Sequence, residues 1–293
     1  MLQGSIVALV TPFDDNEMVD EPKLKELINW HIKKGTDGIL VCGTTGESAT
    51  LSHSEHRRIV ELAVEVAGGR VPLVAGCGSN STREALELTE HAKKVGADYA
   101  LVITPYYNKP TQEGLYRHFK KIADSVDIPI IIYNVPSRTG SNILPETVLK
   151  VYRDCRNVVG IKEASGCLDQ ISRIMSLVDE KFMLFSGSDE ITLPILSMGA
   201  KGVISVVANI LPAQTHELVS AFLTKDVQRA RRIQLELYEI IKALFIETNP
   251  IPVKTALESM GLVKANLRLP LCSMNESNSN RLKEVLRKYK LIK

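Results

Sequence analysis

Eight short apolar runs, evenly spaced along the first two-thirds of the chain, limit its possible folds more than any other feature. They begin roughly 20 to 33 residues apart and do not alternate apolar with polar residues: Ile6–Thr11, Gly38–Gly43, Val71–Gly76, Tyr99–Thr104, Pro129–Asn134, Val158–Glu163, Phe182–Gly187 and Gly202–Val207. Near-continuous apolar runs are typical of parallel strands that are covered on both faces. We therefore predict eight buried, parallel strands.

Amphipathic helical patterns separate these runs, and several of them end in a glycine that suits a helix C-cap. One pattern opens with Ser52 and Glu55, the spacing of a capping box. Eight strand–helix units predict an α/β fold of the (β/α)8 TIM-barrel type. A doubly wound open sheet is the alternative, but no Gly-x-Gly-x-x-Gly follows any run. The patterns are Glu21–Lys34, 52–66, Ser81–Val95 and Thr111–Asp124.

The length of 293 residues suits one barrel with an extension. We predict that residues 1–223 form the catalytic barrel domain. Residues 224–293 contain helical patterns but no strand-like run, which predicts a C-terminal helical domain. Its three patterns are Asp226–Leu244, Pro252–Met260 and Asn280–Lys288.

Charge and cysteine usage narrow the class of protein. A net charge of +2 gives no reason to expect nucleic acid or a membrane surface as a partner. No apolar stretch approaches the roughly 18 residues of a membrane helix, and Met1–Phe13 has no basic leader. The cysteines are odd in number and widely spaced, so we expect a cytoplasmic protein without disulfides. They are Cys42, Cys77, Cys155, Cys167 and Cys272.

Lys162, near the end of the run Val158–Glu163, is the residue that most strongly indicates a catalytic function. Away from water the charged form of an amine is disfavoured, and a neutral amine can attack a carbonyl to form a Schiff base. A lysine at a strand end can also extend its ammonium group into solvent. This residue alone leaves both interpretations open.

In a barrel of this type, functional groups lie at the C-terminal ends of the strands. There the chain offers one amine, several hydroxyls, one arginine and glycines, a set that suits iminium chemistry on a keto acid. Each of these groups also has a purely structural interpretation. The tyrosines can be packing aromatics, the arginine can form a surface ion pair, and the glycine-rich segment can be a tight turn. His53 and His56 lack a third ligand, so no metal is expected. The segments are Gly43–Glu47, Thr104–Asn108, Tyr133–Pro136, Arg138–Gly140, Lys162–Glu163 and Gly187–Glu190.

Five motifs, in order along the chain, carry a family resemblance that runs from Gly4 to the C-terminal helices. They are Ala8–Phe13, Gly43–Glu47, Tyr106–Pro110, Tyr133–Gly140 and Gly160–Glu163. With these the chain resembles the dihydrodipicolinate (4-hydroxy-tetrahydrodipicolinate) synthase family, in the group of pyruvate-dependent class I aldolases that includes N-acetylneuraminate lyase. The resemblance implies condensation of pyruvate with L-aspartate 4-semialdehyde in diaminopimelate and lysine biosynthesis, with no metal or other cofactor.

The resemblance also implies a role for each site residue. Lys162 would form the Schiff base with pyruvate, and Tyr133 would be the proton donor and acceptor. Thr44 and Tyr107 would complete a hydroxyl relay, with Tyr107 entering from the neighbouring subunit of a tight dimer. The usual assembly would be a homotetramer of two such dimers. The substrate-binding positions would be Thr45 and the backbone at Ile204 for pyruvate, Arg138 for the carboxylate of the semialdehyde, and Gly187.

A second set of residues stands where lysine-inhibited members of this family bind their inhibitor, so the resemblance implies feedback inhibition by L-lysine. A carboxylate there can pair with an ammonium group, and amide and phenol groups supply hydrogen bonds. The set is Ser48, Ala49, His53, His56, Asn80, Glu84 and Tyr106.

The stretch Ser186–Glu190 departs from the family pattern. The family commonly has Ser-Gly-Asp-Asp here, whereas this chain has Ser-Gly-Ser-Asp-Glu. Asp189 and Glu190 resemble the acidic pair with which sialic acid lyases bind a polyol. The alternative function is therefore N-acetylneuraminate lyase or a keto-deoxy-sugar-acid aldolase. Thr44 and Arg138 favour the synthase, because an arginine suits a small, anionic second substrate.

Overall fold

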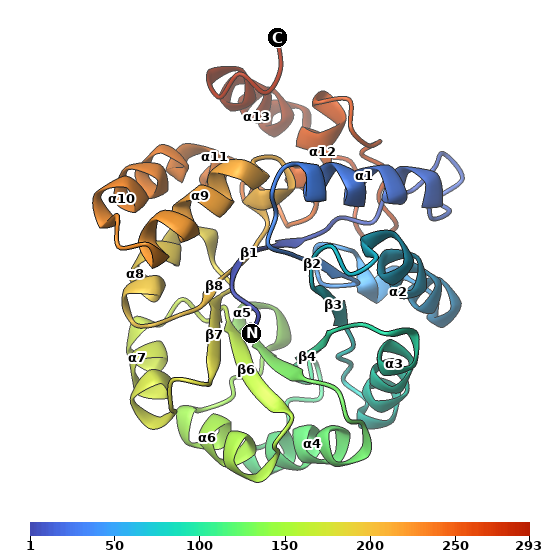
Figure 1. Cartoon of the computed structure of the whole chain (residues 1–293). Helices are drawn as coiled ribbons and strands as arrows, with labels where there is room; N and C mark the ends of the chain where they lie inside the picture. The colour runs from blue at the N-terminus through green and yellow to red at the C-terminus, as the bar shows by residue number, and fades with distance from the viewer.

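The computed structural model describes residues 1–293 and contains a closed barrel of eight parallel strands, with β8 pairing back to β1. A ring of helices surrounds the barrel (Figure 1). All eight predicted strands and the TIM-barrel fold are confirmed. Most strands end before the predicted run does, because its last residues leave the ladder and begin the loop at the C-terminal mouth. The strands are β1 (Gly4–Ala8), β2 (Gly38–Val41), β3 (Leu73–Gly76), β4 (Tyr99–Ile103), β5 (Ile130–Asn134), β6 (Val158–Glu163), β7 (Met183–Ser186) and β8 (Gly202–Ser205).

The helices between strands begin and end close to the predicted patterns. Ser52 and Glu55 form the predicted capping box at the start of α2, and Gly96 closes α3 in the left-handed conformation with φ of 91°. The outer ring comprises α1 (Glu21–Lys33), α2 (His53–Ala67), α3 (Thr82–Val95), α4 (Gln112–Ser125), α6 (Pro145–Asp154), α7 (Leu168–Leu177), α8 (Thr192–Ser197) and α9 (Pro212–Leu223). Short elements in the loops are η1 (Ser48–Thr50), α5 (Pro136–Thr139), η2 (Asp189–Ile191) and η3 (Val207–Asn209).

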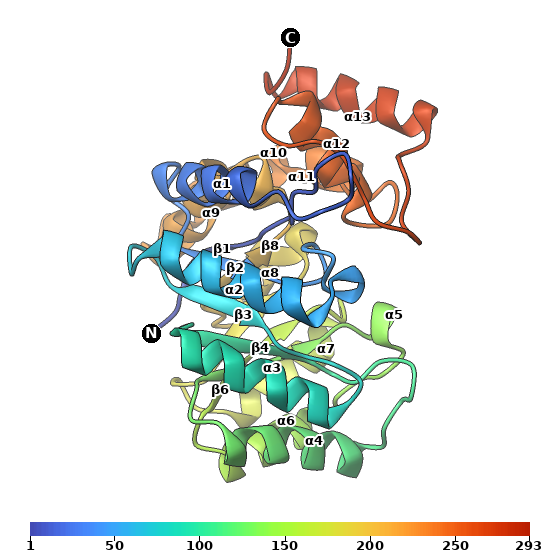
Figure 2. The ribbon, with the colours of Figure 1, turned by 90° about the vertical axis from the view of Figure 1, so that its right-hand side faces the viewer.

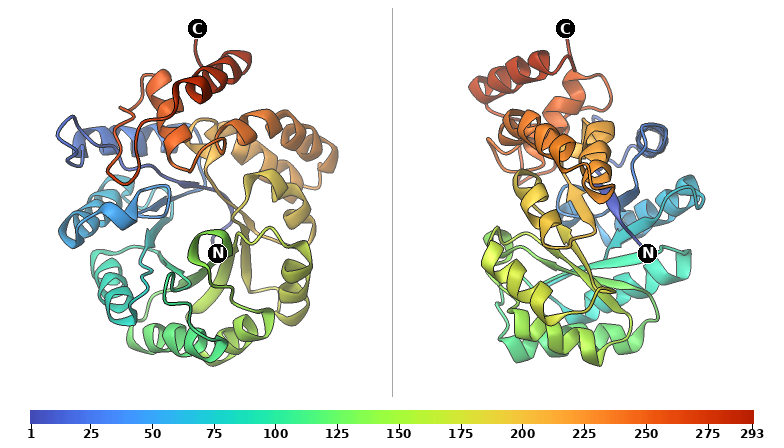
Figure 3. Two further views of the ribbon diagram at one scale, coloured as in Figure 1. Left: turned by 180° about the vertical axis from the view of Figure 1, so that it is seen from behind. Right: turned by 60° about the vertical axis from the view of Figure 1, so that its left-hand side comes forward.

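The C-terminal segment is helical, as predicted, but the pattern Asp226–Leu244 divides at Leu237 into two helices. The helices are α10 (Val227–Glu236), α11 (Tyr238–Ala243), α12 (Ile251–Ser259) and α13 (Glu276–Lys288). Figure 2 and both views of Figure 3 place α12 and α13 together on one side of the barrel, beyond α1. The division into domains at residue 223, where α9 ends, stays a prediction. None of the helices is long and apolar enough to cross a membrane.

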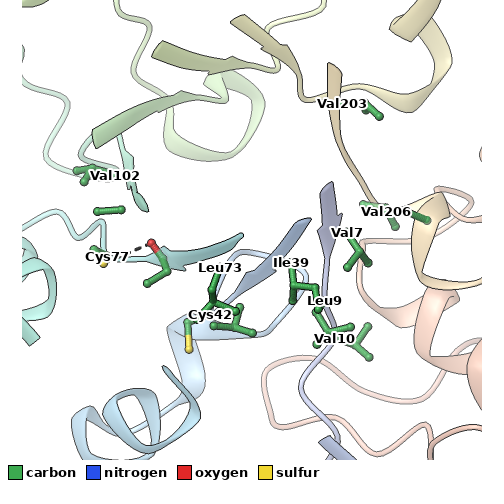
Figure 4. Close-up of a cluster of buried hydrophobic side chains, with 14 of the residues drawn as sticks. Val7, Leu9, Val10, Ile39, Cys42, Leu73, Cys77, Val102, Val203 and Val206 are labelled. Atoms are coloured by element: carbon green, nitrogen blue, oxygen red, sulfur yellow. Dashed lines mark hydrogen bonds between the residues drawn. The ribbon is translucent and has the colours of Figure 1, made fainter. Parts of the chain in front are cut away.

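Two apolar layers hold the barrel together. The larger fills the space between the sheet and its helices, and Figure 4 shows part of it, including Val7, Ile39 and Val203. The smaller lies inside the barrel and contains Ile6 and Ala8. Successive residues of a strand point to opposite faces, which is why Val7 and its two neighbours fall in different layers. The same alternation decides which side chains of β5 and β6 face the barrel interior.

A buried histidine in this shell makes stability dependent on pH. His31 of α1 is fully buried, neither ring nitrogen has a hydrogen-bond partner, and burial lowers its pKa from 6.5 to about 3. Below pH 6.5 the unfolded chain therefore binds a proton at His31 that the folded chain does not. The stabilising contribution is complete above pH 6.5 and is lost as the pH falls toward 3.

We expect this residue to remove about 2–3 kcal/mol of unfolding free energy between about pH 7 and about pH 4.5. Urea unfolding across that range measures the effect, and His31→Leu should flatten the pH dependence. Equal slopes for His31→Leu and the unmodified protein would contradict the expectation.

Candidate active site

A cavity of about 260 Å³ opens at the C-terminal mouth of the barrel. Six of the eight residues predicted for catalysis and substrate binding line it. The other two do not: Tyr107 lies on the surface, and Ile204 is buried in the apolar layer inside the barrel. The six lining residues are Thr44, Thr45, Tyr133, Arg138, Lys162 and Gly187.

Lys162 and Tyr133 face each other across neighbouring strands. They are register partners of β6 and β5, and each is nearly buried, with exposed fractions of 6% and 7%. The Lys162 Nζ atom lies 4.4 Å from the centroid of the Tyr133 ring. A cation over an aromatic face is attracted to it, and the same approach places the amine beside a phenol. The pair therefore combines a nucleophile with a group that can carry protons.

The next residues on the same strands, Asn134 and Glu163, point the opposite way and fix the strand ends. The Asn134 Nδ2 group donates to Glu163 Oε2 at 2.9 Å, and the amide of Gln170 donates to the same oxygen at 3.2 Å. The Ser165 backbone N–H donates to Glu163 Oε1 at 2.7 Å. A fully satisfied buried network is rigid, so it holds the backbone from which Lys162 and Tyr133 project.

Close backbone packing continues at Gly187. A Cβ atom there would lie 2.5 Å from the Cβ of Ala164, so the loop after β7 approaches the loop after β6 more closely than any side chain permits. The Gly187 N–H donates to the Glu163 carbonyl at 2.7 Å. Glycine at this position allows the two loops to meet at the wall of the cavity.

The loop after β2 presents Thr44, which is half-buried, and Thr45, which is 3% exposed. It ends at Glu47, a non-glycine residue in the left-handed region with φ of 55°. Glu47 is buried and accepts a hydrogen bond from Lys254 of α12, with 2.5 Å between Nζ and Oε1. Desolvation lowers the pKa of Lys254 to about 8, and its attraction to Glu47 partly offsets this. A strained residue beside functional hydroxyls is typical of a site.

Arg138 lies at the mouth of the cavity on the short helix α5, which projects from the end of the barrel opposite the N-terminus (Figure 2). Its Nη2 atom donates to the backbone carbonyl of Asn249 at 3.0 Å. Pro136 at the start of α5 and Gly140 in the left-handed conformation at its end confine the helix to one turn. The guanidinium group is exposed, so it remains open to an incoming carboxylate.

Tyr107 points away from the cavity of its own chain. Its side chain is 88% exposed, its φ is 70°, and its N–H donates to the Thr139 carbonyl at 3.3 Å. The bond ties this strained loop to α5. The neighbouring Tyr106 lines a different cavity.

That second cavity measures about 450 Å³, and six of the seven residues predicted for inhibitor binding line it: Ser48, Ala49, His53, His56, Glu84 and Tyr106. Asn80 lies outside the lining, and its carbonyl accepts a hydrogen bond from Asn108. Glu84 accepts hydrogen bonds from Ser79 and, at 2.5 Å, from His53, and these lower its pKa. The cavity therefore contains a carboxylate held in its charged form.

The acidic pair after β7 has structural contacts. Asp189 is 5% exposed, and its Oδ2 atom accepts hydrogen bonds from the N–H groups of Val206 and Val207 at 2.9 and 3.1 Å. Burial raises its pKa. Glu190 is exposed and lies 3.5 Å from the ammonium group of Lys242. Asp189 thus joins the end of β7 to the loop after β8.

Asn249 and Lys254, in the C-terminal segment, lie at the site but were not predicted from the sequence. Asn249 lines both cavities, and Lys254 pairs with Glu47 behind them. Neither follows a barrel strand, so a search confined to strand ends omits them. No group of three or more His, Cys, Asp or Glu side chains is arranged to hold a metal.

Comparison with known proteins identifies relatives over the whole chain. The family model described as the dihydrodipicolinate synthetase family matches residues 1–289. The 4-hydroxy-tetrahydrodipicolinate synthase of Aquifex aeolicus is 54% identical over 99% of both chains, and the crystal structure of dihydrodipicolinate synthase from that organism superposes with a TM-score of 0.97 over 99% of this chain and 98% of that one.

Two further solved structures contain small molecules. Dihydrodipicolinate synthase from Acinetobacter baumannii, complexed with pyruvate, is 44% identical with a TM-score of 0.97 over the full length of both chains. The enzyme from Cyanidioschyzon merolae with lysine bound is 39% identical, with the same TM-score over 99% of both chains. From these matches, this chain belongs to the dihydrodipicolinate synthetase family.

Proposed function

We propose that this protein is a 4-hydroxy-tetrahydrodipicolinate synthase, which condenses pyruvate with L-aspartate 4-semialdehyde on the route to diaminopimelate and lysine. One observation carries the proposal: the nearly buried amine of Lys162 faces the Tyr133 ring in a cavity that also contains Thr45 and Arg138. The relatives described above catalyse this reaction by name, and the pyruvate complex supports the first substrate.

The chemistry follows from the amine. Lys162 attacks the ketone carbon of pyruvate, and loss of water gives an iminium. Loss of a proton from the methyl group gives an enamine, whose carbon attacks the aldehyde carbon of the semialdehyde. The amino group of the semialdehyde then adds to the iminium carbon, which closes the ring and releases Lys162. The iminium is the electron sink for these steps, so the mechanism requires no metal or other cofactor.

The residues around Lys162 transfer the protons and bind the substrates. Tyr133 takes up and returns protons beside the adduct, and Thr44 extends the relay. Thr45 and the backbone at Ile204 hold pyruvate, and Gly187 contributes to substrate binding. Arg138, exposed at the mouth, receives the carboxylate of the semialdehyde, because a guanidinium group binds a carboxylate in a bidentate way.

Tyr107 completes the relay from a neighbouring chain in this proposal. Its exposure of 88% and its strained backbone suit a side chain that is used outside its own subunit. The minimum active unit is then a tight dimer, and two dimers form a homotetramer. All five cysteines are free, which fits a reducing cytoplasm.

Asp189 and Glu190 line the same cavity as Lys162, and Glu190 is exposed there. The relatives, which bear the name 4-hydroxy-tetrahydrodipicolinate synthase, and Arg138 at the cavity mouth favour the synthase over the lyase alternative. A coupled assay separates the two functions. With pyruvate, we expect turnover of aspartate semialdehyde, and no cleavage of N-acetylneuraminate. The reverse outcome would overturn the proposal.

We also propose that L-lysine inhibits the enzyme by binding the second cavity, where the charged carboxylate of Glu84 can pair with an ammonium group. We expect activity to fall as L-lysine is added. Glu84→Gln should raise the half-inhibitory concentration by about 10- to 100-fold, the loss of one charge-assisted hydrogen bond. The matched control Glu87→Gln, on the same helix, should not. A flat titration up to millimolar lysine would reject inhibition, and equal inhibition of both variants would reject the role of Glu84.

A further inference from the structure

Asn249 lies in the connection between α11 and α12, outside every strand–helix unit, yet it is 4% exposed and forms part of the barrel mouth. Only three residues line both cavities, and Asn249 is one of them, with Thr44 and Arg138. It therefore stands in the wall that the two cavities share.

Asn249 contacts Thr45, which we have assigned to pyruvate, and Arg138, which we have assigned to the carboxylate of the semialdehyde. Its Nδ2 group donates to Thr45 Oγ1 at 3.0 Å, and its backbone carbonyl accepts from Arg138 Nη2 at 3.0 Å. The first contact has a chemical consequence, because a hydroxyl has one hydrogen to donate. Since Thr45 accepts from Asn249 and makes no other side-chain hydrogen bond, its own hydrogen stays free for the cavity.

We propose that Asn249 is a positioning residue that makes the Thr45 hydroxyl a hydrogen-bond donor toward the carboxylate of pyruvate, while its backbone holds Arg138 at the cavity mouth. The inference rests on the function proposed above and adds a residue to it. Asparagine suits the task because its amide donates without charge. Aspartate has the same shape but would accept from Thr45 and turn the hydroxyl away from the substrate.

Two further features support a functional constraint at Asn249. Its Oδ1 atom is buried without a hydrogen-bond partner, so the Nδ2 bond to Thr45 is the only side-chain hydrogen bond of Asn249. The segment is also anchored five residues later, where Lys254 binds Glu47 of the loop that carries Thr45. The connection thus touches that loop at two points, which fixes the direction of the Asn249 amide.

The test is Asn249→Asp, with borohydride trapping of pyruvate and steady-state kinetics as readouts. We expect the half-saturating pyruvate concentration to rise at least tenfold. The KM for aspartate semialdehyde should change less than twofold, because the backbone carbonyl that binds Arg138 remains. An unchanged pyruvate requirement would overturn the proposal. So would an equal rise for both substrates, which indicates general disruption.

A double-mutant cycle gives an independent measurement. Thr45→Val removes the hydroxyl, so adding Asn249→Asp to it should not raise the pyruvate requirement further; additive effects would overturn the proposal. If Asn249→Asp fails to fold, Asn249→Ala deletes the donor without adding charge, and it should still raise the pyruvate requirement while sparing the semialdehyde. Absence of any pyruvate adduct in the unmodified protein would instead contradict the proposed function itself.

Discussion

Replacing Lys162 with methionine is expected to abolish the trapping of pyruvate and reduce turnover to background. Methionine keeps the length and apolar character of the side chain but removes the amine, and no other group in the cavity can form the Schiff base. Borohydride reduction in the presence of pyruvate, followed by peptide mass spectrometry, measures the effect. The unmodified protein should carry a single reduced adduct at Lys162, and the variant none.

A matched control separates loss of chemistry from loss of structure. Lys201 precedes β8 at the opposite end of the barrel, so Lys201→Met should retain both the adduct and the activity. Lys162→Met should keep the unfolding midpoint of the original protein or exceed it, because an apolar side chain replaces a nearly buried amine. An adduct that forms on another lysine in the Lys162 variant would contradict the assignment.

Replacing Lys254 with methionine is expected to cause a large loss of stability. The ammonium group is fully buried, pairs with the equally buried Glu47 and also donates to the Asn266 carbonyl at 2.6 Å. With a pKa of about 8, Lys254 is mostly charged at neutral pH. Removal of one partner of a buried ion pair leaves the other charge uncompensated and costs about 3–5 kcal/mol. Urea unfolding at neutral pH measures the loss.

Two comparisons sharpen the second expectation. Lys264→Met removes an exposed ion pair with Asp15 and should change stability by no more than about 0.5 kcal/mol. Adding Glu47→Gln to Lys254→Met should recover part of the loss, because the uncompensated charge is gone. If Lys254→Met is as stable as Lys264→Met, the ion pair does not hold the C-terminal segment to the barrel.

The barrel could be predicted because its strands are covered on both faces and therefore appear as uninterrupted apolar runs. Once eight such runs are placed in a barrel, the ends of β2, β5, β6 and β7 must converge. This is why Thr44, Tyr133 and Lys162 were predicted together and line one cavity. Strand alternation then turns Lys162 inward and Glu163 outward, a result that follows from the period of two alone.

Other features depend on contacts that local patterns do not encode. Asn249 and Lys254 lie more than 200 residues from the loop they contact, and nothing in their own neighbourhood marks them. The role of Tyr107 depends on a second chain, about which the pattern of one chain says nothing. His31 could not be predicted, because a polar residue is not expected on the buried face of α1, where it lies with Leu24, Leu27 and Ile28.

The contacts between the C-terminal segment and the barrel mouth also have a consequence for how the enzyme is made. Synthesis proceeds from the N-terminus, so the barrel strands leave the ribosome before Asn249 and Lys254 do. Thr45 and Glu47 therefore lack their hydrogen-bond partners until Asn249 and Lys254, 204 and 207 residues further along the chain, have been synthesised. A fragment that ends after β8 contains every proposed catalytic side chain. It lacks Asn249 and Lys254, whose hydrogen bonds orient the Thr45 loop and Arg138. Catalytic competence is thus acquired only after Asn249 and Lys254 have been synthesised.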